Sequence, residues 1–279
     1  MLEIGINSKC ECGKNFKESL KNVKKANIKN IMYDFRNGND EKNIKTILKL
    51  GLRIPFAHLY YRYANDLWAK GEANREYIED VQNQIRLCSK YNIPLAVMHA
   101  TNGEASMLAL PPSEHALNSM LEILKTAEEY NVKIALENLD APNFDRFTFL
   151  LDNIKSPYLG LCYDAGHHNL YKAEFDILKT YGDRILAIHL HDNFMDWEYG
   201  YDYTRDMHLI PFDGKIDYNN VINNIANTNY NNVVMFELHK ISSGYPKLYE
   251  DISDMKFLQI AKERAEKIAK AIENLRNKK

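Results

Sequence analysis

The feature that most constrains the fold of this chain is a set of short apolar segments that each lead into a histidine or an acidic residue. Segment 159–168, LGLCYDAGHH, runs directly into Asp164 and His167. Four more segments follow the same pattern: 95–99 reaches His99, 134–138 reaches Glu137, 185–191 reaches His189 and His191, and 233–239 reaches Glu237. A parallel barrel with a metal site on one face needs this placement, because its functional residues stand at the carboxyl ends of the strands.

The apolar segments alternate strictly with helical patterns along the chain. We expect strands at 2–7, 31–35, 52–58, 95–99, 132–138, 158–164, 185–190 and 233–238. We expect helices at 16–26, 41–50, 74–91, 114–130, 144–154, 174–181 and 218–228, a long C-terminal helix at 251–277, and a long loop at 193–215. Strand–helix alternation of this length predicts one α/β domain, residues 1–279, folded as a (β/α)8 TIM barrel.

An open doubly wound sheet is the alternative fold. It is disfavoured because Asn7, Ser8 and Lys9 stand where its glycine-rich turn would follow the first strand.

Charge and cysteine content limit the partners and the compartment. The 36 Lys and Arg residues against 38 Asp and Glu residues give a formal net charge of −2, so no overall basic surface indicates nucleic acid or an anionic membrane. The cysteines Cys10, Cys12, Cys88 and Cys162 follow neither a disulfide nor a zinc-ribbon spacing, which favours free thiols in a reducing cytoplasm. The sequence has no signal-peptide pattern and no apolar run of about 18 residues. We therefore expect a cytoplasmic protein.

Nine residues at strand exits and in the long loop have side chains that bind metals. They are His58, His99, Glu137, Asp164, His167, His189, Asp206, His208 and Glu237. A single histidine or glutamate is more often a structural residue, but the strand exits of a barrel converge on one face, so their coincidence predicts a metal site. Carboxylates and imidazoles without thiolate suit Mn²⁺, Zn²⁺ or Co²⁺. Cys162 precedes Asp164 by two residues and is expected to face the barrel interior as a packed thiol.

Several segments resemble the xylose isomerase-like TIM barrel superfamily, which contains sugar phosphate isomerases and epimerases and also endonuclease IV. The matching segments are IALENL with Glu137, CYDAGHH with Asp164 and His167, AIHLHDN with His189, RDMHLIPFDGKID with Asp206 and His208, and FEL with Glu237. The resemblance covers about residues 2–240. It implies one divalent metal (Mn, Zn or Co) held by Glu137, Asp164, His189 and Glu237. The family has Gly-Glu where this chain has Phe212 and Asp213, so any role of that glutamate is in doubt.

The resemblance also implies a function, that of a metal-dependent isomerase or epimerase of a sugar or sugar phosphate. Such an enzyme removes a proton next to a carbonyl through a metal-stabilised enediolate, with Glu137 and Glu237 as the catalytic residues. His167 and His208 are implied to contact the hydroxyls of a small carbohydrate substrate. A dehydratase or lyase that acts on a keto-sugar or keto-inositol shares this first step and stays open, as does a non-catalytic sugar-sensing barrel.

Endonuclease IV supplies a further alternative, a phosphodiesterase that acts on abasic DNA. Its three zinc ions use nine ligands, and this chain has candidates at all nine, including His58, His99, His167, Asp206 and His208 as additional metal or substrate ligands. Nucleic acid is disfavoured because the net charge is slightly negative and the loops after His58 and His99 hold few Lys or Arg residues for phosphates.

Aromatic residues near these segments are candidates for the wall of a pocket. Trp197, Tyr199, Tyr201 and Tyr203 lie in the long loop, and four aromatic side chains in one loop need a surface to cover. They either close the pocket, with Trp197 in contact with substrate, or contact another subunit of a homo-oligomer. The residues after His58, which are Tyr60, Tyr61, Tyr63 and Trp68, either line the pocket or form a separate patch.

His191 and Asp192 follow His189 closely and each allows two interpretations. His191 either faces the site beside His189 or orients one of the ligands. Asp192 either orients His189 or caps the turn that follows it.

Overall fold

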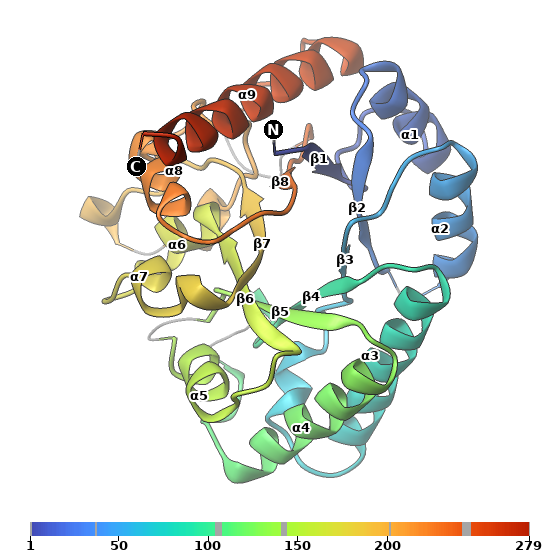
Figure 1. The fold of residues 1–279 in the computed structure, drawn as a ribbon, viewed down its shortest axis with the longest axis vertical. Helices are drawn as coiled ribbons and strands as arrows, with labels where there is room; N and C mark the ends of the chain where they lie inside the picture. The colour runs from blue at the N-terminus through green and yellow to red at the C-terminus, as the bar shows by residue number, and fades with distance from the viewer. Residues whose placement is uncertain are drawn as a thin grey trace.

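The computed structural model describes residues 2–36, 38–103, 108–140, 144–200, 202–241 and 247–278. Eight parallel strands close into a barrel in sequence order, and β1 pairs with both β2 and β8. The strands are β1 (Ile4–Asn7), β2 (Asn30–Asp34), β3 (Ala57–His58), β4 (Leu95–His99), β5 (Lys133–Glu137), β6 (Leu159–Asp164), β7 (Ile185–Leu190) and β8 (Val234–Phe236). The predicted TIM barrel is confirmed, and Figure 1 shows the strands enclosed by helices.

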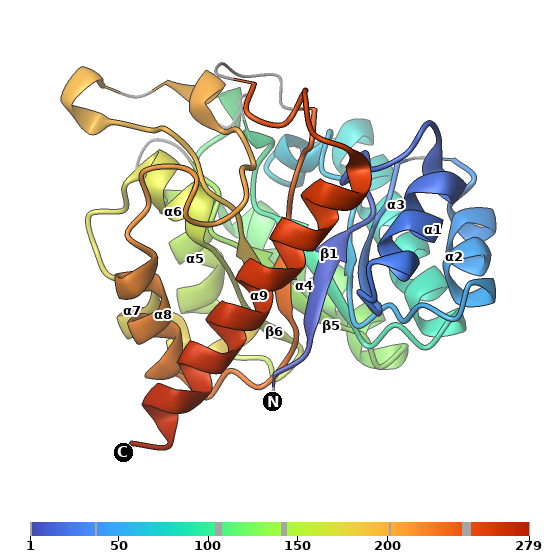
Figure 2. The ribbon, with the colours of Figure 1, turned by 90° about the horizontal axis from the view of Figure 1, so that it is seen from above.

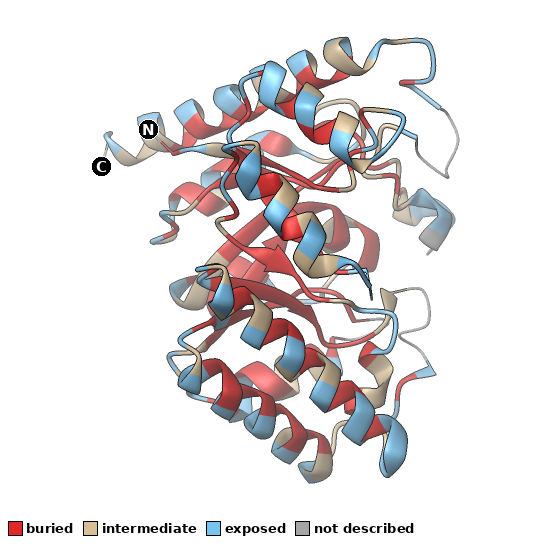
Figure 3. Ribbon diagram, turned by 90° about the vertical axis from the view of Figure 1, so that its right-hand side faces the viewer, coloured by how far each residue is buried: buried red, intermediate tan, exposed pale blue. Residues whose placement is uncertain are grey.

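The helices cover the outside of the barrel. The α-helices are α1 (Phe16–Lys25), α2 (Asp40–Lys49), α3 (Glu72–Lys90), α4 (Glu114–Glu129), α5 (Asp145–Asn153), α6 (Ala165–Tyr171), α7 (Ile177–Tyr181), α8 (Tyr218–Ala226) and α9 (Asp254–Arg276). Short 3-10 helices are η1 (Ala64–Leu67), η3 (Gly182–Arg184), η4 (Trp197–Tyr199) and η5 (Tyr203–Arg205). Each long helix buries one side against the strands and exposes the other, as Figure 3 shows by colour.

Several elements differ from the sequence-based expectation. The expected strand at 52–58 is reduced to Ala57–His58 and an isolated bridge between Asn30 and Arg53, because Pro55 has no N–H for the ladder. Helix α6 was not expected, and it begins where the Asp164 side chain accepts a hydrogen bond from the N–H of His167. The long C-terminal helix begins at Asp254 rather than at 251, because the side chain of Ser253 caps its first turn.

A layer of apolar side chains fills the interior of the barrel. We call this layer the barrel floor; it comprises Met32, Phe56, Leu95, Val97, Ala135, Cys162, Ala187, Val233 and Met235. All of them are at most 5% exposed. Cys162 lies among them, as expected, and all four cysteines are free and buried.

The loops after the strands lie at one end of the barrel. The loop that carries η4 and η5 lies at the end opposite to the N-terminus (Figure 2). Within the described ranges, no helix has the length and apolar character needed to span a membrane.

Candidate metal centre

The nine predicted metal-binding side chains meet at the carboxyl ends of the strands. His58, His99, Glu137 and Asp164 end their strands, while His189 lies near the end of β7. The remaining four come from the segments that follow: His167 in α6, Asp206 and His208 after η5, and Glu237 directly after β8. Because inward-facing residues alternate along a strand, each of these strand residues lies two positions beyond a residue of the barrel floor.

Three carboxylates converge on His189. One ligand atom from each of Glu137, Asp164, His189 and Glu237 lies within 4.8 Å of the other three, and we call these four residues the primary group. His189 Nδ1 lies 2.9 Å from Glu237 Oε2, 3.5 Å from Glu137 Oε2 and 3.7 Å from Asp164 Oδ2. All four residues are buried. They form the four-ligand set that the family resemblance implies.

Further possible ligand groups overlap or adjoin the primary group, and two of them contain the remaining predicted histidines. The second group contains His58, His99 and Glu137, with Glu137 Oε2 lying 3.1 Å from His58 Nε2 and 3.2 Å from His99 Nε2. The third group contains His167, His191, Asp206 and His208. It lies against the primary group, because His167 Nδ1 is 2.7 Å from Glu137 Oε1.

Buried polar atoms without hydrogen bonds are concentrated in these three groups. Among the described residues, twelve buried side-chain nitrogen or oxygen atoms have no hydrogen-bond partner. Ten of the twelve belong to His99, Glu137, Asp164, His167, His189, His191, Asp206 and Glu237. Each such group costs about 1–3 kcal/mol unless something binds it. Divalent metal ions fit this set, because carboxylate oxygens and imidazole nitrogens are ligands of Mn²⁺, Zn²⁺ and Co²⁺.

The protonation of the primary group is set by burial and by neighbouring charge. Burial raises the pKa of Glu137 and of Glu237, but the neighbouring histidines, His189 foremost, together outweigh it and hold the pKa of both carboxyls well below the usual value. Both glutamates are therefore ionised at neutral pH. Burial lowers the pKa of His189, but Cys162 and Glu137 raise it well above the usual value.

Among the histidines of the other groups, the structure raises the pKa of some and lowers that of others. Burial lowers the pKa of His167, but Asp164 and Asp206 raise it well above the usual value. Burial lowers the pKa of His99 and of His208, and in these two the effect of burial prevails. The carboxylates and the imidazoles together hold opposite charges in one buried space, which a bound cation would rearrange.

His191 packs against His208 and Asp164. Its ring stacks on that of His208 with centroids 3.9 Å apart and planes 2° apart, and its Nε2 lies 3.1 Å from Asp164 Oδ1. A Cβ atom on Gly166 would overlap the ring, so the glycine of DAGHH makes room for it. A metal ion binds an imidazole nitrogen in the plane of the ring, so two parallel rings are poorly placed to share one ion. The geometry thus favours His191 as a side chain that orients ligands.

Asp192 caps the turn that follows β7. Its carboxylate accepts hydrogen bonds from the backbone N–H groups of Asn193, Phe212 and Ile216. Asp192 also pairs with Leu209 through two backbone hydrogen bonds. These contacts fix the segment that carries Asp206 and His208 over the end of the barrel.

The aromatic candidates occupy different places. Trp197 donates from its Nε1 to the Asn169 carbonyl, and the ammonium of Lys172 lies 5.5 Å from its ring centroid, so this ring packs beside α6. Tyr199 is 84% exposed, while Tyr201 and the side chain of Tyr203 lie outside the described residues. The contact of Trp197 with substrate stays a prediction.

The aromatic residues after His58 also separate. Tyr61 stacks on His99 with ring centroids 4.6 Å apart, which places it at the edge of the second group. Trp68 is buried and donates to the Ala100 carbonyl, so it belongs to the core.

Sequence reasoning missed two residues at this end of the barrel. Asp34 ends β2, is 2% exposed and lies two positions beyond the floor residue Met32. The same strand-exit rule that identified Glu137 would therefore have found it. Lys9, 3.9 Å from Asp34, follows β1 in a segment without any pattern that marks it.

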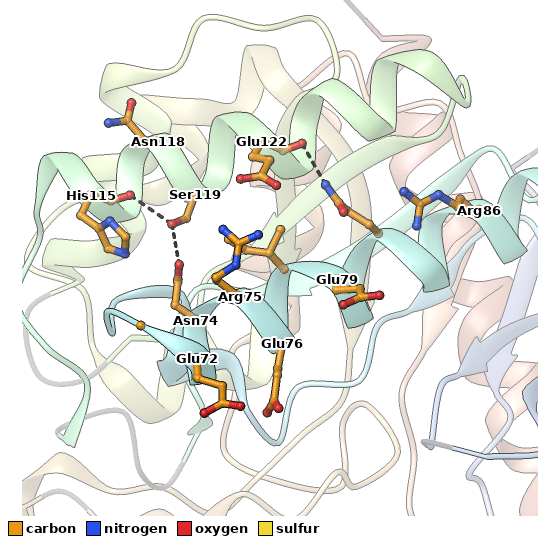
Figure 4. A pocket seen from close by; sticks show the side chains of 13 residues that line it. Glu72, Asn74, Arg75, Glu76, Glu79, Arg86, His115, Asn118, Ser119 and Glu122 are labelled. Carbon is orange, nitrogen blue, oxygen red and sulfur yellow. Dashed lines mark hydrogen bonds between the residues drawn. The ribbon is translucent and has the colours of Figure 1, made fainter.

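A separate hollow of about 800 Å³ lies on the outer surface between α3 and α4 (Figure 4). It is lined by side chains of both charges, including Glu72, Arg75 and Glu122, and none of the nine metal-binding candidates reaches it. Ser119 donates to Asn74 across the hollow. It is therefore distinct from the candidate metal centre.

Comparison with known proteins establishes the family. A model of the family described as xylose isomerase-like TIM barrel matches residues 11–278. The chain belongs to this family, as the resemblance of its strand-end motifs predicted.

Individual relatives are more distant. An uncharacterised protein of Sinorhizobium fredii, y4fM, is 30% identical over 169 residues, which is 57% of this chain and 52% of that protein. The match thus spans about half the length of that relative. An inosose isomerase of Bacillus velezensis is 23% identical over 199 residues, covering 70% of this chain and 69% of that protein.

Solved structures share the fold at low sequence identity. A D-tagatose 3-epimerase-like protein has a TM-score of 0.72 at 22% identity, with 99% of each chain covered. An IOLI protein with a binding zinc atom has a TM-score of 0.74 at 16% identity, covering 96% of this chain and 98% of that one.

Proposed function

We propose that this protein is a divalent metal-dependent isomerase or epimerase that acts on a polyhydroxylated carbonyl compound. The observation that carries the proposal is the convergence of two buried glutamates with Asp164 and His189 in the primary group. The names of an inosose isomerase and a D-tagatose 3-epimerase-like protein among the similar proteins point to the same chemistry.

Glu137, Asp164, His189 and Glu237 would hold the metal ion. When bound, such an ion polarises a carbonyl oxygen and stabilises the negative charge that develops on it. His167 and His208 lie at the edge of the primary group and would donate hydrogen bonds to substrate hydroxyls.

Glu137 and Glu237 would move the proton. They approach His189 from β5 and from the end of β8, with Oε2 atoms 3.5 and 2.9 Å from its Nδ1. A lowered pKa keeps each carboxylate in its ionised form, and only that form can accept a proton from the carbon beside a carbonyl. Carboxylates acting on two faces of the substrate invert a carbon, as an epimerase does, whereas one carboxylate serving two neighbouring carbons gives an isomerase. A lyase would use the same first step.

A second candidate function is hydrolysis of a phosphodiester at a cluster of up to three zinc ions. The observation that favours it is that Glu137 belongs to both the primary and the second group, while the third group lies against them through His167. We rank it second because the formal net charge is −2, without the basic balance that supports nucleic-acid binding.

Solvent exchange tests the first proposal. The metal-loaded protein is incubated in deuterated water with D-fructose, D-tagatose, D-ribulose and a keto-inositol, and NMR follows loss of the proton beside the carbonyl. We expect exchange with at least one compound, and Glu237→Gln should slow it by about 100-fold or more, because general base catalysis contributes on this order.

The control is Glu79→Gln, an exposed glutamate of α3 outside the barrel, which should leave the exchange unchanged. Unchanged exchange in Glu237→Gln would contradict the assignment of Glu237. Absence of exchange together with cleavage of a duplex containing an abasic site would favour the second candidate.

A further inference from the structure

A second polar cluster stands at the same end of the barrel, on the side of β1 and β2. Asp34 is 2% exposed, and its Oδ2 accepts a 2.7 Å hydrogen bond from the Ser8 hydroxyl. Among the described residues, no hydrogen-bond donor reaches its other oxygen, Oδ1. The Lys9 ammonium lies 3.9 Å from that oxygen, too far for a hydrogen bond.

Lys9 is also without a hydrogen bond in the described part of the chain. Its side chain is only 19% exposed, and its ammonium lies 5.2 Å from the ring centroid of Tyr61. The Lys9 ammonium and the Asp34 Oδ1 atom, which both lack hydrogen bonds in the described part of the chain, form a gap with a donor on one side and an acceptor on the other. A hydroxyl at about 2.8 Å from each atom spans a gap of this size.

Tyr61 connects this cluster with the candidate metal centre. One contact of its ring is with Lys9 and another is the stack on His99, whose Nε2 lies 3.2 Å from Glu137 Oε2. The Tyr61 ring therefore contacts both clusters. Its flat, partly exposed ring suits the C–H face of a sugar.

We propose that Lys9, Asp34 and Tyr61 form a hydroxyl-binding subsite that selects a neutral polyol over a phosphorylated sugar. Lys9 donates to a substrate hydroxyl and Asp34 accepts from it or from its neighbour, while Tyr61 packs on the carbon skeleton. A phosphate held by Lys9 would lie against the Asp34 carboxylate, and like charges in contact disfavour binding. The inference rests on the proposed function, because the subsite would bind the part of the substrate that lies away from the reacting carbons.

Calorimetry with matched ligands tests the subsite without requiring turnover. The metal-loaded chain is titrated with D-fructose and D-fructose 6-phosphate, D-ribulose and D-ribulose 5-phosphate, and D-tagatose and D-tagatose 6-phosphate. We expect a neutral ketose to bind more tightly than its phosphate. Asp34→Asn should weaken the binding of the neutral ketose by about ten-fold or more, as loss of a hydrogen bond to a charged group does. It should also reduce the preference for the neutral ketose over its phosphate.

Lys9→Met is the second variant and should also weaken the binding of the neutral ketose. It keeps the test decisive if Asp34→Asn folds poorly. The matched controls are Lys49→Met in α2 and Asp183→Asn in η3, both exposed and away from the strand ends. They should change neither affinity. Tighter or equal binding of the phosphates, no binding of any neutral ketose, or unchanged ligand preference in both variants overturns the subsite.

The two proposals fail separately. Proton exchange that persists while Lys9→Met and Asp34→Asn bind as the unaltered chain does would remove the subsite and leave the isomerase or epimerase proposal. Selective binding of neutral ketoses without any proton exchange would leave the subsite and remove that proposal.

Discussion

The barrel floor and the candidate metal centre are built by the same strands and differ in almost every physical property. Val97, Ala135 and Cys162 of the floor stand two positions before His99, Glu137 and Asp164. Both layers therefore face the interior. The floor is apolar and closely packed, while the adjacent layer collects ten buried polar atoms without hydrogen bonds.

This difference separates what the two layers do. Burying apolar side chains stabilises the fold by about 25 cal/mol per Å², whereas unpaired buried polar groups oppose folding. Proteins retain such groups mainly where a ligand or a reaction needs them. The floor thus supports the barrel, and the layer above it is arranged for binding.

The largest expected effect comes from removing the charge of Glu137, which belongs to both the primary and the second group. Glu137→Gln keeps the size of the side chain but removes a charge from the primary and second groups. We expect turnover to fall by about 10³-fold, because charge stabilisation at a reacting centre is worth about this much, and bound metal to be lost. Steady-state rates and elemental analysis measure the two effects, and a fully active, metal-loaded variant would contradict the account.

A substitution in the barrel floor should lower the stability of the protein and leave its metal binding unchanged. Met235 is fully buried and stands two positions before Glu237. Met235→Ala should lower the free energy of unfolding by about 2–5 kcal/mol while the folded protein keeps its metal. Urea denaturation and elemental analysis of the same sample give both values. Loss of metal from a well-folded Met235→Ala protein would show that the layers are not separable in this way.

Gly166→Ala disturbs the metal centre without removing a ligand. The added Cβ would overlap the ring of His191, which packs on His208 and lies beside Asp164. We expect a loss of about 1–3 kcal/mol in unfolding free energy, as overpacking usually costs, together with weaker metal binding. Competition with a chromogenic chelator measures the affinity. Gly182→Ala is a milder control, because the added Cβ would lie 3.0 Å from Thr228 Cγ2.

The smallest expected effect is on the pH dependence of stability. The pKa values of Glu137 and Glu237 are lowered by folding, so their contribution is present above about 4.3 and is lost as pH falls. Those of His167 and His189 are raised, so their contribution is present below about 6.5 and is lost as pH rises. These four groups together favour the folded, metal-free protein most between these limits.

Added metal should reduce the loss on the alkaline side, because metal ions bind neutral imidazoles. Urea denaturation from pH 4 to 8, with and without a chelator, measures this. Identical profiles in the two series would contradict a metal bound by these histidines.

Much of this architecture is predictable from the sequence. Strict alternation of strands and helices is sufficient to predict the barrel. The rule that polar residues at the carboxyl ends of the strands converge on one face predicted that Glu137, Asp164 and His189 lie together. The exit rule works because a parallel barrel directs every strand end to one face.

The remaining features depend on local contacts that a periodic pattern does not reveal. Pro55 interrupts the third strand, and the seven residues of α6 are too few for a helical period to be read. His191 depends on the room left by Gly166, which only the folded chain shows.

Metal content per chain tests the central claim most directly. The protein is purified without chelator, equilibrated with Mn²⁺, Zn²⁺ or Co²⁺, freed of unbound ions and measured by elemental analysis beside Glu237→Gln. The account predicts about one divalent ion per chain, lost in the variant. Two to three zinc ions would contradict the single-metal account and favour phosphodiester hydrolysis, and no retained metal would contradict a metal centre in this barrel.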